Sequence, residues 1–290
     1  MERETVESRQ TACAKAEPAA PDSEQPAPHA PSSATSMVLE IPKSIHECVM
    51  ALAPHIKTMR TLAFQSNHDM TVHYELEARF GRCDDKSRFV PDVGGSMGKQ
   101  IEQMLLSFEQ WDSVSDGWIE SHDYFYTHQG QRIRTSVTFN GGKMSQHHVL
   151  KSTIAKLTMG FDTVLENSQP VHIRAIVAQE QHIQPKMVPD IVQPEYVRIK
   201  QRRSFRRGCW SFDLTRTWQG KDRQEAEVHQ DNQEPCYEFE VECCNPRVYF
   251  QEKFHTDEYI ATSLIMKMKD FLPFAYNSIH MHVVSDTRNY

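Results

Sequence analysis

Two segments of the sequence place glutamates at every second position. Residues 75–81 read Glu-Leu-Glu-Ala-Arg-Phe-Gly, and residues 237–242 read Tyr-Glu-Phe-Glu-Val-Glu. In an extended strand alternate side chains point to the same face, so each segment presents a row of carboxylates. Rows of glutamates that converge repel one another unless a cation lies between them, and Mg²⁺ takes carboxylate oxygens as ligands. The rows, which indicate a divalent-cation site, are Glu75 and Glu77 in the first segment and Glu238, Glu240 and Glu242 in the second.

Two other segments repeat this spacing with basic residues. Residues 131–136 read Gln-Arg-Ile-Arg-Thr-Ser, and residues 198–202 read Arg-Ile-Lys-Gln-Arg. Arginine offers a fork of donors that matches phosphate, and lysine adds a compact point charge. Acidic and basic rows around one cavity suit a metal ion bound to a chain of phosphates. The basic rows are Arg132 and Arg134 in one segment, and Arg198, Lys200 and Arg202 in the other.

A sheet with one face in water is the alternative interpretation, because such a sheet also alternates charged and apolar side chains. It accounts for any single strand. It accounts less well for the rows together, since like charges in direct cross-strand contact destabilise a sheet. The rows therefore favour polar faces that point inward and apolar faces that point outward onto helices.

The residues around these rows have the period of strands. Successive β-rich runs with no regular helix between most of them predict a mainly β (α+β) protein with an antiparallel sheet or barrel. The runs are Val72–Phe80, Ser121–Thr127, Gln131–Asn140, Ser145–Lys151, Val171–Glu180, Tyr196–Arg206, Cys209–Trp218 and Cys236–Cys243. The expected helices, the first interrupted near Pro54, are Ser44–Phe64, Met97–Trp111 and the stretch from Thr256 to about Phe271. Residues 219–235 read as a long surface loop.

Composition and motif spacing exclude several classes of protein. The 290 residues carry a net charge of −7, which argues against non-specific coating of nucleic acid. No apolar run approaches the length of a membrane helix, and no phosphate-binding glycine loop, paired C-x-x-C or H-E-x-x-H is present. The odd count of 7 cysteines suits reduced thiols in the cytosol or nucleus. Residues 1–36, rich in Pro, Ala and Ser, are predicted to form a disordered tail before a single domain of residues 37–290.

The two glutamate segments resemble the signatures of the triphosphate tunnel metalloenzymes. Within that superfamily, the chain resembles the metal-dependent mRNA 5′-triphosphatases, or mRNA-capping enzyme beta subunits, of fungi, protozoa and some large DNA viruses. The resemblance spans roughly residues 72–243, and the layout is most similar to that of kinetoplastid-type members. It implies an eight-stranded antiparallel β-barrel tunnel with a polar interior, flanked by a few helices.

The resemblance also implies roles for the acidic residues. Glu75, Glu77 and Glu242 match the carboxylates that hold the catalytic metal, Mg²⁺ or Mn²⁺. Glu238 and Glu240 match supporting positions beside metal-bound waters and basic neighbours.

The basic residues and one further glutamate match positions around the substrate. Arg134 matches an arginine that contacts the terminal phosphate, and Lys200 and Arg202 match a Lys-x-Arg pair on the same group. Lys151 matches a substrate-binding lysine of the barrel, and Glu180 is the chosen match for the glutamate that orders the attacking water.

Five further positions complete the comparison with the family pattern. Asp123 matches an acidic position early in the β region, and Asp213 with Thr215 matches an Asp-x-Thr strand. Fungal members have arginine two places before that aspartate, where this chain has Ser211, which leaves one basic contact in question. Phe80 matches an apolar position outside the tunnel.

The implied reaction is hydrolysis of the γ-phosphate of a 5′-triphosphate RNA end to a 5′-diphosphate, the first step of mRNA capping. The implied partners are the RNA end and RNA guanylyltransferase, with no membrane, and the family role places the protein in the nucleus. The sequence does not distinguish a monomer from a homodimer. The alternatives are a tunnel enzyme for inorganic tripolyphosphate, nucleoside triphosphates or thiamine triphosphate, a non-hydrolytic polyphosphate-binding module, and a scaffold without ligand.

Overall fold

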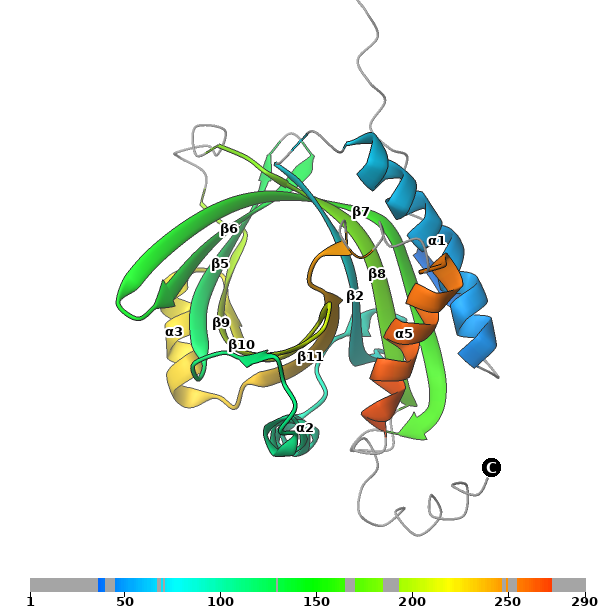
Figure 1. Ribbon diagram of the computed structural model, residues 1–290. Coiled ribbons are helices and arrows are strands. Elements are labelled where there is room, and N and C mark those ends of the chain that lie inside the picture. The colour runs from blue at the N-terminus through cyan, green and yellow to red at the C-terminus, as the bar shows by residue number, and fades with distance from the viewer. Residues whose placement is uncertain are drawn as a thin grey trace, which may run out of the picture. The chain divides into compact units, whose positions relative to one another are not determined.

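The computed structural model describes residues 36–39, 45–66, 69, 71–128, 130–164, 170–184, 193–246, 249 and 255–272. Its centre is a closed antiparallel barrel, which Figure 1 shows along its axis. The barrel strands are β2 (Val72–Cys83), β5 (Ile119–His128), β6 (Gln131–Asn140), β7 (Lys143–Val164), β8 (Pro170–His182), β9 (Tyr196–Arg207), β10 (Trp210–Gly220) and β11 (Cys236–Cys243). The barrel closes because β2 pairs with both β8 and β11. The predicted eight-stranded barrel is therefore confirmed.

Short strands and helices lie around the barrel (Figure 1). The additional strands are β1 (Ser36–Leu39), β3 (Phe89–Val90) and β4 (Ser113–Val114), which pair with β7, β2 and β9 respectively. The helices are α1 (Ile45–Gln65), α2 (Gly95–Ser107), α3 (Arg223–Asn232) and α5 (Asp257–Asp270). Helices α1 and α5 lie side by side over one side of the barrel, and α3 covers β9 and β10 (Figure 1). None of the helices in the described ranges is both long and apolar enough to cross a membrane.

The apolar core lies outside the barrel wall, beneath the helices. The outward faces of β2 and β11 bury Leu76, Phe80 and Phe239 completely. Phe80 stacks on Phe239 with ring centroids 5.7 Å apart, and Phe239 meets Phe271, the residue after α5, at 4.5 Å. Burying these faces against α1 and α5 leaves the opposite, polar faces of the same strands to line the interior.

The helix expected to break near Pro54 is instead continuous, which corrects that prediction. Pro54 lies on the exposed side of α1, where water can satisfy the carbonyl that loses its donor. The other two expected helices are confirmed as α2 and α5, and the Thr256 hydroxyl caps α5 by accepting from the backbone N–H of Tyr259 at 3.1 Å.

The loop predicted at residues 219–235 is wrong, because α3 occupies most of it. Asp222 caps this helix by accepting from the backbone N–H of Glu225 at 2.9 Å. Ala226 alone of the helix is buried, against Val197 and Ile199. One alanine gives no apolar period, so the sequence pattern did not reveal the helix.

The predicted tail, residues 1–36, lies outside the described residues except for Ser36, the first residue of β1. The prediction that residues 37–290 form a single domain also stays a prediction. Strand β7 extends well beyond its predicted end at Lys151, to Val164.

Gly98→Ala is expected to destabilise the protein by about 1–3 kcal/mol, because the new methyl group overpacks a filled contact. A Cβ at Gly98 would lie 2.4 Å from Cδ1 of Tyr237, where α2 packs on β11. Urea denaturation measures the change in the free energy of unfolding.

Gly95→Ala is the matched control in the same helix, since its Cβ would lie 3.9 Å from Cε2 of Tyr237, an ordinary contact. Equal stabilities of the two variants would contradict the packing of α2 on β11.

Candidate functional site

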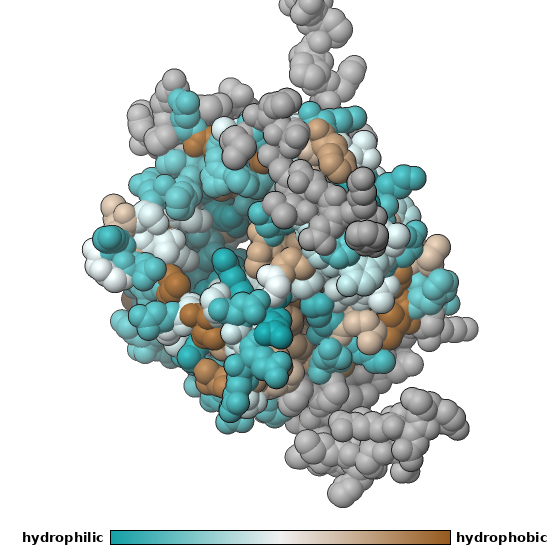
Figure 2. Space-filling view, viewed as in Figure 1, coloured by the Kyte–Doolittle hydropathy of each residue, from teal (hydrophilic) through white to brown (hydrophobic). Residues whose placement is uncertain are grey.

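The interior of the barrel is a charged tunnel. Two adjoining cavities of about 270 and 350 Å³ lie within it and share most of their charged walls. The space-filling view is hollowed at the barrel's centre, and hydrophilic residues border most of the opening (Figure 2). The charged lining residues are Glu75, Glu77, Arg79, Asp123, Arg132, Arg134, Lys151, Lys156, Arg198, Lys200, Arg202, Glu238, Glu240 and Glu242.

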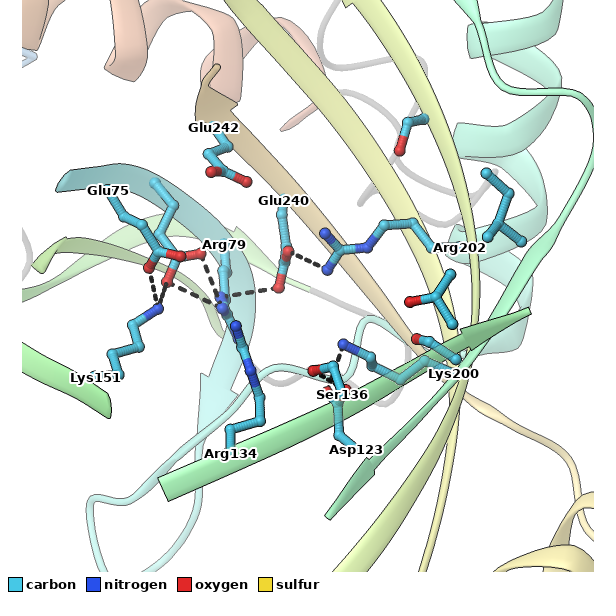
Figure 3. A pocket seen from close by; sticks show the side chains of 15 residues that line it. Glu75, Arg79, Asp123, Arg134, Ser136, Lys151, Lys200, Arg202, Glu240 and Glu242 are labelled. Atoms are coloured by element: carbon cyan, nitrogen blue, oxygen red, sulfur yellow. Dashed lines mark hydrogen bonds and ion pairs between the residues drawn. The ribbon is translucent and has the colours of Figure 1, made fainter. Parts of the chain in front are cut away.

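Glu240 lies between two guanidinium groups at the centre of the tunnel (Figure 3). One carboxylate oxygen lies 3.0 Å from Nε of Arg79, and the other accepts a hydrogen bond from Nη2 of Arg202 at 2.9 Å. Burial alone would raise the pKa of Glu240, but Arg79 and Arg202 outweigh it and lower the pKa to about 2. Arg79 also contacts Glu77 of its own strand at 2.9 Å. Its contact with Glu240 joins β2 to β11.

Lys151 lies among three carboxylates on the β7 side of the tunnel. Its ammonium group contacts Glu75 and lies 3.5 Å from Glu77 and 3.9 Å from Glu180. Glu180 accepts a hydrogen bond from Nη2 of Arg134 at 3.0 Å. Burial raises the pKa of the Glu75 carboxyl, an effect that Lys151 opposes and Glu180 reinforces.

Lys200 is held by Asp123 on the neighbouring strand. The ammonium group lies 2.6 Å from Oδ2 of Asp123, whose other oxygen accepts from the Ser136 hydroxyl at 2.7 Å. Burial lowers the pKa of Lys200 to about 8, against the attraction of Asp123 and with repulsion from Arg202 and Arg134. Lys200 is therefore a cation whose charge is lost within an accessible pH range.

Arg202 is also anchored on β10. Its guanidinium donates to Asp213 at 3.0 Å and to the Thr215 hydroxyl at 3.1 Å. Ser211, the position where the sequence left a basic contact in question, donates its hydroxyl proton to Asp213 at 2.6 Å. Arg216 lies on the outer face, 3.2 Å from Glu102 of α2, and does not enter the tunnel. Ser211 thus hydrogen-bonds the carboxylate of Asp213, which in turn binds Arg202, but Ser211 adds no positive charge to the tunnel.

Glu238 occupies the far end of the β11 row. It forms an ion pair with Arg198 of β9, and its carboxylate lies 3.4 Å from the Thr217 hydroxyl. This pair ties β9 to β11 across β10.

Glu242 differs from the other glutamates of the tunnel because it forms no ion pair with any described residue. It is the direct register partner of Glu77 across β11 and β2. Burial and the nearby charges of Glu75, Glu77 and Asp213 raise its pKa to about 8, against the attraction of Arg202. Figure 3 shows Glu242 apart from Glu75, which turns toward Lys151.

The donors of this region fit a divalent cation by their chemistry. Glu75, Glu77 and Glu242 are carboxylates on adjacent strands, and like charges directly opposite one another are costly without a cation. Within the described ranges, no three His, Cys, Asp or Glu side chains are already grouped as a metal site. Binding at these three residues would therefore require Glu75 to exchange its contact with Lys151 for the metal.

Every residue predicted for the site is brought to the barrel interior, where it lines a cavity or contacts a side chain that does. These residues are Glu75, Glu77, Arg134, Lys151, Glu180, Lys200, Arg202, Asp213, Glu238, Glu240 and Glu242. Their assigned roles stay predictions. Phe80 packs outside, as expected.

Arg79 was not assigned a role from the sequence. Its position two residues after Glu77 placed it on the same strand face, so strand parity alone was sufficient to include it. The stacked pair Phe125 and Tyr196 was also missed, because the two rings come from different strands.

Comparison with known families gives a match over more than half of the chain. The sequence profile of the family described as mRNA capping enzyme, beta chain, matches residues 119–272. This range includes β5 to β11 but not β2, so the pairing of β2 with β11 is what brings Glu75 and Glu77 to the matched strands. No curated protein matches the sequence.

The solved structures that share the fold include two of one protein. The RNA triphosphatase Pct1 of S. pombe is 18% identical, with a TM-score of 0.57 over 82% of this chain and 95% of that chain. The structure of the same protein in complex with the Spt5 CTD is also 18% identical, with a TM-score of 0.58 over 82% of this chain and 96% of that chain.

Glu240→Gln is expected to lower the free energy of unfolding by about 3–5 kcal/mol, because it leaves two buried guanidinium groups without their shared counter-charge. Glu242→Gln, two residues away on the same strand face, is expected to do the opposite in metal-free protein at pH 8. Urea denaturation across pH 5 to 8 compares the two variants with the wild type.

The opposite effect of Glu242→Gln on the free energy of unfolding follows from the linkage between proton binding and folding. A carboxyl whose pKa rises from 4.5 to about 8 on folding binds its proton more tightly when folded. Stability therefore falls as the pH rises through that range. Glu242→Gln removes this loss, so a variant that keeps the full pH dependence would contradict the uncompensated charge.

Proposed function

The chain belongs to the family of mRNA capping enzyme beta chains, as its glutamate rows predict, and from that premise we propose that it is a metal-dependent RNA 5′-triphosphatase. It removes the γ-phosphate from the 5′-triphosphate end of RNA and leaves a 5′-diphosphate end, the first step of mRNA capping. The observation that carries the proposal is the arrangement of charges inside the barrel. A cluster of basic side chains lines the same cavity as Glu242, which forms no ion pair with a described residue. The kinetoplastid type stays a prediction.

The basic cluster consists of Arg134, Lys200 and Arg202, which all line both cavities. Phosphoryl transfer passes through a loose transition state with charge spread over three oxygens, so it needs positioning and charge stabilisation. Arg202 is fixed by Asp213, Thr215 and Glu240, which leaves it little freedom when phosphate arrives. The three cations therefore bind and orient the terminal phosphate.

The acidic side supplies the remaining functions. Glu75, Glu77 and Glu242 would hold Mg²⁺ or Mn²⁺, which would supply a Lewis acid to the phosphate oxygens. Glu180 accepts from Arg134 and lies near Lys151, so it can hold a water beside the phosphate and accept its proton. Glu240 fixes the positions of the Arg79 and Arg202 guanidinium groups by contacting one with each carboxylate oxygen.

Glu75→Ala is expected to abolish phosphate release from γ-labelled triphosphate-ended RNA in saturating Mg²⁺ or Mn²⁺, with an unchanged circular dichroism spectrum. Glu227→Ala, an exposed carboxylate of α3 outside the tunnel, is the control and keeps wild-type turnover. Near-normal turnover of Glu75→Ala would refute the metal assignment.

Arg202→Lys is expected to lose activity by a large factor, because a point charge cannot reproduce the forked contacts of arginine. An unchanged kinetic profile would refute direct phosphate contact.

Phosphate release is expected to fall as the pH rises above about 8, where Lys200 loses its proton. Lys200→Arg keeps its charge at alkaline pH, so its pH profile should lose that decline. A decline that persists unchanged in the variant would assign it to another group.

Substrate selectivity distinguishes the proposal from its rivals. A tripolyphosphatase or nucleoside triphosphatase would release phosphate faster from those compounds than from triphosphate-ended RNA. A non-hydrolytic polyphosphate-binding module would show a higher thermal midpoint with Mn²⁺ and tripolyphosphate but no turnover, and a scaffold would show neither.

Partners and location belong to the same proposal. One related structure contains Pct1 with the Spt5 CTD. For this chain we propose RNA guanylyltransferase as the partner that receives the diphosphate end, and the nucleus as the site of action. Co-purification of the tagged chain with guanylyltransferase activity, and its location by microscopy, test these two statements.

A further inference from the structure

An aromatic pair lies at one end of the tunnel, outside the phosphate site. Phe125 of β5 and Tyr196 of β9 are direct register partners, and their rings stack with centroids 4.4 Å apart and planes 13° apart. Both rings line the cavity of about 350 Å³, and both are only partly buried. Partly exposed aromatic rings in a tunnel lined mostly by charged side chains suit a ligand that has an apolar face as well as a charge.

Arg132 of β6 completes this end of the tunnel. Its guanidinium carbon lies 4.9 Å from the centroid of the Phe125 ring and 5.1 Å from that of Tyr196, and the guanidinium donates to the Tyr196 hydroxyl. The side chain is exposed, and no carboxylate among the described residues pairs with it. Phe125, Arg132 and Tyr196 are called the aromatic mouth below.

The aromatic mouth lies at the opposite end of the tunnel from Glu242. Along β5, Ile119 lines only the smaller cavity, Asp123 lines both, and Phe125 lines only the larger cavity. Strand β6 gives the same order, with Arg134 shared by both cavities and Arg132 in the larger cavity alone. Each mouth residue on these two strands is one strand repeat, about 7 Å, beyond the phosphate site.

The charge at this end suits an entering anion. Lys156 lines the larger cavity and, like Arg132, forms no ion pair with any residue in the described part of the chain. Burial lowers the pKa of Lys156, and the nearby cations Arg174 and Lys151 lower it further. Arg132 and Lys156 would therefore attract a polyanion at the aromatic mouth, from which it would pass Lys156 to reach Arg134 and Lys200.

Planar groups of this kind bind nucleobases. Bases stack on aromatic rings and on arginine guanidinium planes whatever their identity, because every base has a π face. We propose that the aromatic mouth is the subsite for the first nucleoside of the RNA, whose base stacks on this platform while its triphosphate extends past Lys156. The proposal rests on the proposed function and deepens it, since it separates RNA ends from inorganic tripolyphosphate.

Steady-state kinetics with two substrates test the subsite. Phe125→Leu, which fills the volume without a π face, is expected to raise the KM for a triphosphate-ended RNA about five-fold or more. Its KM for inorganic tripolyphosphate should stay at the wild-type value. Phe125→Trp should restore the KM for RNA. Phe139→Ala, at the other end of β6 on its outer face, is the matched aromatic control and should change neither KM.

A binding measurement tests the same contact without turnover. A triphosphate-ended oligonucleotide with 2-aminopurine as its first base is titrated with protein in EDTA, where stacking on an aromatic ring quenches its fluorescence. The wild type and Phe139→Ala should quench it, and Phe125→Leu should not. An oligonucleotide with 2-aminopurine at its fourth base should show no such difference.

The outcomes separate the subsite from the function. Equal increases of both KM values in Phe125→Leu, or quenching that persists in this variant, would overturn the aromatic mouth as a base subsite. Wild-type protein that hydrolyses neither substrate would refute the proposed function, and the fluorescence titration would then still decide whether the aromatic mouth binds a base.

Discussion

The charge balance inside the barrel is the constraint on which the rest of the structure depends. A tunnel with polar walls buries many ions, and each must meet an opposite charge or lose its own. Glu240 meets this requirement by lying between Arg79 and Arg202 from two other strands. The same contacts hold β2, β9 and β11 in register around the cavity.

This charge balance also explains why the barrel has a polar interior and an apolar exterior. With the polar faces occupied by one another, the apolar faces of β2 and β11 must be covered from outside, which α1 and α5 do. The residues predicted for the site therefore lie on barrel strands whose outer faces pack against helices. Among the described residues, Glu242 is an interior carboxylate without an ion pair, and under the proposed function a cation from outside the chain would complete the balance there.

The sequence was sufficient for much of the fold, because a period of two is visible wherever charges alternate with apolar residues. The rows at Glu75 and Glu238 lie inward as predicted. Helix α3 could not be predicted from an apolar period, because it buries only Ala226. The continuity of α1 was missed for another reason, since an exposed proline such as Pro54 does not end its helix. Cross-strand partners depend on register, so no local pattern could show that Phe125 meets Tyr196.

With its pKa raised to about 8, Glu242 is expected to be protonated in the metal-free protein at pH 7 and to release that proton when a metal binds. Calorimetric titration of Mn²⁺ at pH 7, in two buffers of different ionisation enthalpy, measures the protons released on binding. We expect a net release of protons from the wild-type protein that disappears in Glu242→Gln. Metal binding with no proton release, or with release unchanged in that variant, would contradict it.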